Sequence, residues 1–434
     1  KESMSPIAVR KKEEQANVLD SIKPEAAPSA ELQIRQKSFS SGLQPPRVQE
    51  ILDPPTRIAY QSEVDRNRAK VIEETLESLG APSKVVDIHH GPAITQFCLE
   101  PGLLDHRTGS QRVTVSKISN HAGDIALALS VRNVRLEIPV AGKSYIGIEV
   151  PNEELEPVSL REGIESKNFQ RTQGELKFVL GKDVSGEFHC ASLEDMPHLL
   201  IAGTTGSGKS VCMNSILTCL LLQYSPDELK LLMIDPKRVE LANYNRIPHL
   251  LNPVIVDAEK APAYLKWLLR EMDRRLEEFN VRKVRDITEY NATQEEKMPF
   301  IVVAIDELST LMMLAPIEIE ATLNRLAEMA RATGIHLIVA TQRPSVKVIT
   351  GKIKANFPAR ISFSVVSGTD SRVGIDKSGA DHLVGKGDML FHSPESGKPK
   401  RLQGAFISDH EIERIVEYWQ KVAEEQKNQA QLKG

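Results

Sequence analysis

The chain has 434 residues and a formal net charge of −4; 41% of its residues are hydrophobic and 26% are charged. This balance is ordinary for a water-soluble chain with a sizeable core, and the length predicts two or three domains. The negative charge excludes a uniformly basic nucleic-acid-binding surface, so contact with nucleic acid would need locally concentrated positive charge. Aromatic residues, at 5%, are too sparse for a stacking platform for single strands.

The first part of the chain divides into a polar segment and a small α+β domain. Residues 1–49 are rich in Lys, Glu, Ser, Pro and Gln, which predicts a disordered linker. Residues 50–155 carry short apolar runs between turn residues and predict a domain with no chemistry of its own. Its expected helices are 65–79 and 123–129, and its expected strands are 85–88, 94–99, 113–118, 134–138 and 146–150.

From residue 156 to 426 short apolar strands alternate with helices. After an acidic connection over residues 151–174, this alternation predicts an α/β domain with a mostly parallel sheet and helices on both faces. The expected strands are 198–201, 229–234, 300–305, 335–340, 360–366 and 388–391, and the expected helices are 209–222, 261–279, 317–332 and 409–426. Residues 427–434 form a tail.

The cysteine pattern points to a reducing compartment. Cys98, Cys190, Cys212 and Cys219 contain no CxxC pair and no zinc-ligand spacing, so we expect buried thiols. No apolar run approaches the roughly 18 residues that a membrane span needs, and no signal peptide is evident.

A phosphate-binding loop is the strongest motif in the chain. Gly203-Thr204-Thr205-Gly206-Ser207-Gly208-Lys209-Ser210 fits GxxxxGK[ST] between a predicted strand and a predicted helix. Glycines allow backbone N–H groups to turn toward phosphate oxygens, and the helix N-terminus adds a positive dipole end. Lys209 is expected to reach the β- and γ-phosphates of ATP and Ser210 to ligate Mg²⁺. The loop alone does not separate a hydrolase from a kinase or a passive nucleotide binder.

A second acidic motif favours hydrolysis. The apolar run 301–305 ends in Asp306 and Glu307. We expect Asp306 to hold Mg²⁺ and Glu307 to polarise the attacking water. Gln342, which follows the next predicted strand, is placed to sense the γ-phosphate, although a plain loop before Pro344 is the alternative.

Positive charge is concentrated between residues 341 and 360, which contain no Asp or Glu. This stretch follows a strand end, where ligands bind in such folds, and can contact the phosphates of a nucleic acid. An ordinary solvated surface is the alternative. Its basic residues are Arg343, Lys347, Lys352, Lys354 and Arg360.

Taken together, these motifs resemble the FtsK/SpoIIIE family of double-stranded DNA translocases over residues 51–424. The resemblance is carried by the P-loop run 198–210, Met233-Ile234-Asp235-Pro236-Lys237, the segment 334–345, Gly387-Asp388-Met389-Leu390 and the segment 404–409. Residues 115–118 and 147–152 resemble the family's α domain. The combination is specific, whereas the P-loop alone is not.

The resemblance implies a homo-hexameric ring that pumps duplex DNA by ATP hydrolysis, with an α-domain tier and a RecA-like motor tier. It implies that Arg331 acts in trans as an arginine finger and that Arg343 and Arg372 contact DNA in the pore; a helix-end cation and structural ion pairs are the alternatives. It also implies a parent protein anchored on the cytoplasmic side of the bacterial membrane through an N-terminal region outside this chain. Neither that region nor the family's γ domain is expected here.

The chain departs from the family pattern in one loop. It has Ser-Gly-Thr-Asp-Ser-Arg at 367–372, where members often have Ser-Lys-Ile-Asp-Ser-Arg, and it gains Lys347 and Lys352. We interpret this as DNA-facing charge moved from one loop to the other. Related conjugative coupling or type VII secretion motors, which move another cargo, are an alternative function, and a non-enzymatic nucleotide-gated assembly module is a third.

Overall fold

The computed structural model describes residues 42–56, 62–106, 109–140, 145–395 and 397–433. Within these residues the apolar side chains form a smaller and a larger hydrophobic core. Most of the predicted linker, residues 1–41, lies outside the described part. The last two residues of the predicted linker, Val48 and Gln49, lie instead in α2 (Val48–Ile51), and Val48 packs against the larger core.

The smaller core lies between one sheet and α3 (Ser62–Ser78). In the described residues the sheet has four antiparallel strands in the order β1-β2-β6-β5. Ile72 and Leu76 of α3 are fully buried against Phe97 and Ile148 of the sheet, because a spacing of four residues places both on one helix face. The strands are β1 (Ser83–His90), β2 (Ile94–Pro101), β5 (Arg135–Glu137) and β6 (Ile146–Pro151).

One strand predicted in this part is wrong. The run 113–118 was expected to be extended, but α4 (Val115–Asn120) occupies it and α5 (Ala122–Ala128) follows. Apolar residues at Val115 and Ile118 satisfy helical as well as strand spacing over so short a run. A hairpin that the pattern did not predict, β3 (Leu103–His106) with β4 (Gly109–Arg112), precedes them.

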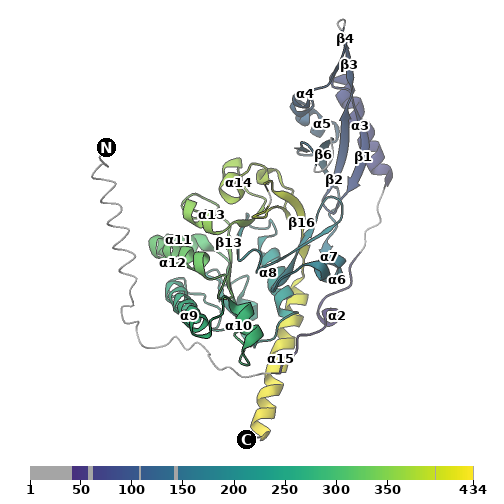
Figure 1. Ribbon diagram of the computed structural model, residues 1–434. Helices are drawn as coiled ribbons and strands as arrows, with labels where there is room; N and C mark the ends of the chain where they lie inside the picture. Colours follow the sequence, from purple (N-terminus) through teal and green to yellow (C-terminus); the bar gives the residue numbers. More distant parts are fainter. Residues whose placement is uncertain (1–41, 57–61, 107–108, 141–144, 396, 434) are drawn as a thin grey trace, which may run out of the picture. The chain divides into compact units, whose positions relative to one another are not determined.

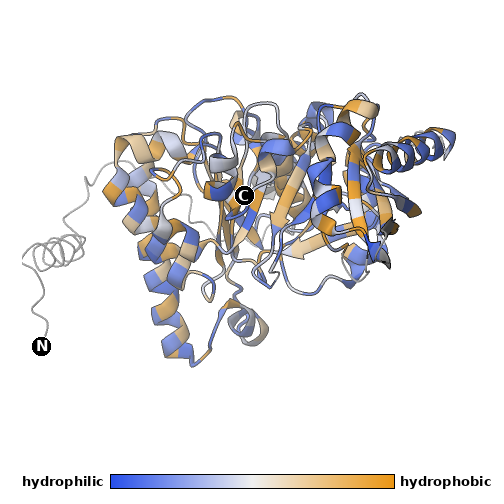
Figure 2. Cartoon of the chain, turned by 90° about the horizontal axis from the view of Figure 1, so that it is seen from above, coloured by the Kyte–Doolittle hydropathy of each residue, from blue (hydrophilic) through white to orange (hydrophobic). Residues whose placement is uncertain are grey.

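The larger core is built on a mixed sheet of ten strands among the described residues. Five of them, in the order β11-β12-β13-β10-β14, are parallel, and their burial on both faces explains their continuous apolar sequences. They are β11 (Leu229–Ile234), β12 (Phe300–Ile305), β13 (Ile335–Thr341), β10 (His198–Ala202) and β14 (Ala359–Phe363). Figure 2 shows strands coloured largely as hydrophobic in the interior of the molecule.

An antiparallel half extends this sheet beyond β14. β15 (Asp388–His392), β16 (Lys400–Phe406), β8 (Lys177–Lys182) and β9 (Phe188–Ser192) follow in that order, and β7 (Val158–Ser159) pairs with β16. Of these only β15 was predicted. The expected connection 151–174 also contains β7, α6 (Leu160–Glu165) and α7 (Lys167–Arg171).

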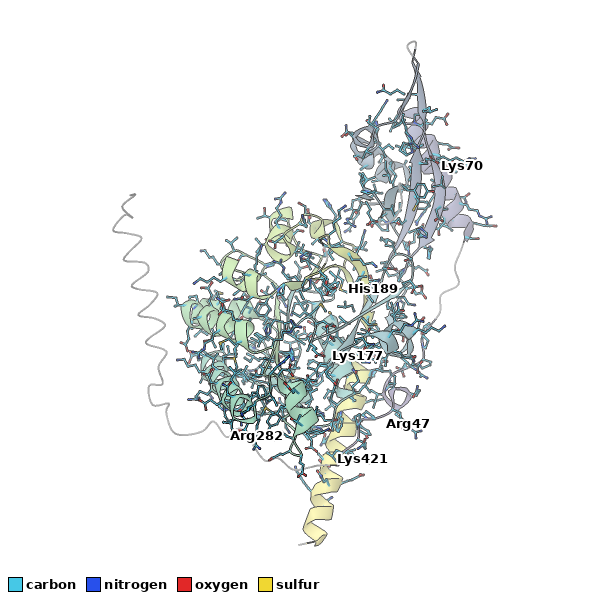
Figure 3. The ribbon with its side chains drawn as sticks, viewed as in Figure 1. Arg47, Lys70, Lys177, His189, Arg282 and Lys421 are labelled. Atoms are coloured by element: carbon cyan, nitrogen blue, oxygen red, sulfur yellow. The ribbon has the colours of Figure 1, made fainter. Side chains whose placement is uncertain are left out.

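Helices cover both faces of the large sheet (Figure 1). α9 (Ala261–Arg282), α12 (Pro316–Met329) and α13 (Gly351–Asn356) pack on one side, and α8 (Lys209–Leu221) packs on β8 and β16. The side chains of Lys70 on α3 and Arg282 on α9 project outward (Figure 3). The other elements of this part are η1 (Ala242–Arg246), α10 (Ile287–Thr293), α11 (Leu308–Leu314), α14 (Gly368–Ile375) and η2 (Ala380–His382).

The last helix, α15 (Asp409–Lys433), closes the larger core. Ser408 and Glu411 form a capping box at its start, and fully buried Trp419 donates its indole N–H to the Leu221 carbonyl of α8 at 3.1 Å. The tail predicted at 427–434 is wrong as a separate element, because α15 continues to Lys433. No described helix is long and apolar enough to cross a bilayer.

Candidate functional site

The glycine-rich loop connects β10 to α8. Gly206 and Gly208 have φ values of +76° and +117°, which L-residues rarely adopt. A Cβ on Gly208 would lie 2.7 Å from the Gly387 backbone, and the Gly387 N–H donates to the Ser207 carbonyl at 2.8 Å. The loop is therefore supported from outside by residue 387, while its N–H groups and the start of α8 provide an anion site.

Three parallel strands bring the predicted site residues together. β10, β13 and β12 are neighbours, and their carboxyl ends carry the P-loop, Thr341 with Gln342, and Asp306 with Glu307. Parallel strands end at the same sheet edge, so residues more than 100 positions apart in the chain form one site.

Lys209 and Asp306 form a buried ion pair at this edge. The Lys209 ammonium contacts Oδ1 of Asp306 and donates to the Asp306 carbonyl at 3.0 Å. Both side chains are at most 2% exposed. A buried charge without a partner is costly, so each holds the other when no anion is bound.

The other Asp306 oxygen, Oδ2, is buried and has no hydrogen-bond partner in the described part of the chain. An orphan carboxylate oxygen beside the start of α8, where Ser210 lies, fits a hard cation such as Mg²⁺. No group of three His, Cys, Asp or Glu with metal-site geometry exists among the described residues.

Glu307 is held ionised by a ring of donors. Its Oε1 accepts from the Ser309 and Thr341 hydroxyls at 2.7 and 2.8 Å, and its Oε2 accepts from Lys237 Nζ at 2.9 Å. Burial acts to raise the pKa of Glu307, but the hydrogen bonds from Lys237, Ser309 and Thr341 outweigh it and lower that pKa below its usual value.

Gln342 connects Glu307 to the P-loop. Its backbone N–H donates to both Glu307 oxygens at 3.3 and 3.2 Å, and its side-chain oxygen accepts from the Thr205 hydroxyl at 3.1 Å. Gln342 therefore contacts both Glu307 and Thr205, and Arg343 directly follows it in the chain.

Arg331 lies at the opposite end of the parallel strands from the P-loop, just before β13 begins. It follows α12 and precedes β13, whose seven residues span about 20 Å before the site edge is reached. The side chain is exposed. Arg331 therefore cannot reach the P-loop of the same chain.

The predicted DNA-binding residues fall on two neighbouring segments. Arg343, Lys347, Lys352 and Arg372 are exposed and make no ion pair with any described residue. Lys354 differs, since it pairs with Asp376 at 2.6 Å and donates to the Arg372 carbonyl at 3.0 Å. Lys354 thereby joins α13 to α14 and is less available to a ligand than the other four.

The structure adds site residues that the sequence did not single out. Lys237 was noted only as part of a family motif, although it is the cation on Glu307. A cavity of about 1040 Å³ extends from the P-loop to three further segments. They are residues 152–157, 384 with 386–387, and 403–406; parts of them lie in segments that resemble the family, but sequence analysis assigned them no role as cavity walls.

The fold and this site define a P-loop ATPase motor domain preceded by a smaller domain. The sequence profile of the FtsK/SpoIIIE family matches residues 159–346, and that of the FtsK alpha domain matches residues 46–152. The chain belongs to the FtsK/SpoIIIE family.

Two curated relatives illustrate the similarity. "DNA translocase FtsK" of Caldanaerobacter subterraneus subsp. tengcongensis is 54% identical over 359 residues, which cover 82% of this chain and 50% of the relative. "DNA translocase SpoIIIE" of Bacillus subtilis is 45% identical over 433 residues, which cover 96% of this chain and 54% of the relative. The chain thus spans about half the length of the curated relatives it matches.

A solved structure shares the fold. The conjugation coupling protein TcpA, in a monomer form with ATPγS, superposes with a TM-score of 0.55 at 24% identity and covers 81% of this chain and 99% of that chain.

The close contact between Gly208 and Gly387 predicts a specific defect. In Gly208→Ala the added Cβ must displace the Gly387 backbone, so nucleotide affinity should fall at least tenfold. Gly186→Ala is the matched control, because Gly186 also has positive φ (+80°) but no atom lies within 4 Å of its Cβ position. Titration with a fluorescent ATP analogue, together with melting curves, measures both. Equal affinity in the two variants would contradict the prediction.

Proposed function

We propose that this chain is the motor portion of an ATP-driven double-stranded DNA translocase. The single observation that carries the proposal is the ionised Glu307. It directly follows Asp306, whose carboxylate contacts the P-loop lysine, Lys209, at the same edge of the sheet. A passive nucleotide binder has no need for such a carboxylate. The names of the curated relatives support duplex DNA as the substrate.

The chain's own residues support the following hydrolysis mechanism. The residues Gly203 to Ser210 bind the phosphates, and the Lys209 ammonium moves from Asp306 to the β- and γ-phosphate oxygens. Ser210 and Asp306 would hold Mg²⁺, which would supply positive charge against the negative charge that develops on the phosphates. Glu307 accepts a hydrogen bond from the attacking water and orients it.

Coupling to DNA follows from the position of Gln342. Loss of the γ-phosphate changes the contact between Thr205 and Gln342, and the shift passes to Arg343 and the following basic loop. Lysine and arginine contacts to DNA phosphates carry no base identity, so movement should be largely independent of sequence. We assign Arg343, Lys347, Lys352 and Arg372 to this surface, with Lys354 supporting it.

The assembly that fits this site is a homo-hexameric ring. Arg331 supports it, because an exposed arginine at the far edge of one subunit can complete the P-loop site of the next. The smaller domain, over residues 62–151, forms a separate tier. We further propose that the parent protein is anchored on the cytoplasmic side of the bacterial membrane and acts in chromosome segregation at division or sporulation.

ATPase assays test the proposed function directly. Wild type should be stimulated by duplex DNA more than by single strands or by unfolded protein, and Lys209→Ala should show no turnover. Glu307→Gln should bind ATP and assemble but hydrolyse it at least 100-fold more slowly. Glu295→Gln, at an exposed position, is the control. Stimulation by protein alone would favour a secretion motor, and normal turnover in Glu307→Gln would remove that residue from catalysis.

The ion pair to Lys237 predicts a pH effect. Glu307 must be ionised to orient water, so activity falls as pH drops through its pKa. Lys237→Met removes a cation that lowers this pKa, so the acid limb of the rate profile should move to higher pH. Lys266→Met breaks a surface pair with Glu318 and should leave the limb in place. A uniform loss of rate at every pH would contradict the assignment.

The exposed lysines of the basic loop predict a salt effect. Lys347→Ala combined with Lys352→Ala should reduce the slope of log affinity for duplex DNA against log salt by about two, since each phosphate contact contributes about one. The exposed pair Lys283→Ala with Lys297→Ala removes equal charge outside the basic loop and controls for net charge. An unchanged slope would exclude these lysines from the DNA surface.

A further inference from the structure

The turn between α12 and β13 carries Arg331 and has a hydrogen-bonded backbone. The Ala330 carbonyl oxygen accepts from the Thr333 and Ile335 N–H groups, both at 3.1 Å. The Arg331 carbonyl oxygen accepts from the Gly334 N–H, also at 3.1 Å. These bonds close the turn on itself and leave its backbone little freedom to move.

Two other helices supply the next bonds of this turn. The Ile287 N–H at the start of α10 donates to the Ala332 carbonyl oxygen at 2.9 Å. Arg275 of α9 donates from its guanidinium to the Thr333 carbonyl oxygen at 2.8 Å. The carbonyl oxygens of four successive residues, 330–333, are therefore all bonded, and α9 and α10 fix the turn from outside.

The side chain of Arg331 contrasts with this fixed backbone. It is exposed, and it makes no hydrogen bond or ion pair with any residue that the structure describes. A cation without a partner on a fixed backbone is already placed for a target outside its own chain. Such placement reduces the entropy that is lost when the target binds.

Arg275 is the buried support of the turn. Its side chain is only 2% exposed and pairs with Glu271 of the same helix at 2.9 Å. Glu271 does not depend on Arg275, because Arg274 donates two hydrogen bonds to it at 2.8 Å. A guanidinium is costly to bury, and the bond to Thr333 is what Arg275 provides and Arg274 does not.

We propose that Arg275 is a positioning residue for Arg331. It holds the turn so that the Arg331 guanidinium meets the phosphates bound at the P-loop of a second copy of this chain. The inference rests on the proposed function, in which Arg331 completes the site of the next subunit. Arg275 does not line the cavity at its own P-loop, so its loss should spare ATP binding in its own subunit and slow hydrolysis in the neighbour.

Single variants test the first part of this proposal. Arg275→Met should bind a fluorescent ATP analogue like wild type, but its kcat with duplex DNA should fall at least tenfold. Arg275→Lys keeps the charge beside Glu271 and should show the same loss, because an ammonium lacks the planar fork that serves a carboxylate and a carbonyl together. Arg274→Met is the matched control and should keep its kcat. Melting curves verify folding, and Arg275→Lys carries the test if Arg275→Met does not fold.

Mixed assemblies show in which subunit the defect lies. Lys209→Ala has an intact turn but no turnover of its own. Mixed in equal amounts with Arg275→Met, it should restore about half of the wild-type kcat per Arg275→Met subunit, since about half of these subunits then receive an intact turn from a neighbour. Arg331→Ala mixed in the same way is the reference for a lost guanidinium. Wild type mixed with Lys209→Ala measures any general inhibition, for which the other mixtures are corrected.

The outcomes separate the inference from the proposed function. A wild-type kcat in Arg275→Met overturns the positioning role, and so does an equal loss of ATP affinity and kcat. Restoration of Arg331→Ala without restoration of Arg275→Met also overturns it, because the defect would then lie within the variant subunit. A wild-type kcat in Arg331→Ala, or its failure to be restored by mixing, overturns instead the action of Arg331 on the next subunit.

Discussion

The buried pair between Lys209 and Asp306 is the interaction on which the site depends. Neither charge is stable in the interior without the other, and each has a second potential partner, phosphate for the lysine and a metal ion for the carboxylate. In the proposed mechanism, an incoming nucleotide with its cation would replace this ion pair and would give the unpaired Oδ2 of Asp306 a partner. The parallel strands β10, β12 and β13 make this exchange possible, since they fix both residues at one edge of the sheet.

Sequence reasoning predicted the parts of the molecule in which local pattern and chemistry coincide. The P-loop, Asp306, Glu307 and Gln342 come together as expected because each directly follows a continuous apolar strand of the parallel half. Lys237 was not given a role, because its partner Glu307 is 70 residues away and no local spacing links them. The cavity walls were not given a role for the same reason, although parts of them lie in segments that resemble the family.

The antiparallel half of the sheet shows a second limit of prediction from the sequence. β16 contains Arg401. A charged residue in a strand predicts an exposed position, yet the Arg401 side chain is only 5% exposed. Arg401 is buried because Glu149 of the smaller domain accepts from it at 2.6 Å and Asp388 of β15 at 2.7 Å. Burial of a charge depends on partners that are distant in the chain, and hydropathy cannot represent them.

The contact of Trp419 with the end of α8 has a mechanical consequence. One end of α8 receives the phosphates, and the carbonyl of its last residue, Leu221, is bonded to an indole that is locked in the core. Contacts therefore hold α8 at both of its ends. Any displacement of α8 along its axis would therefore be transmitted to α15 through this hydrogen bond.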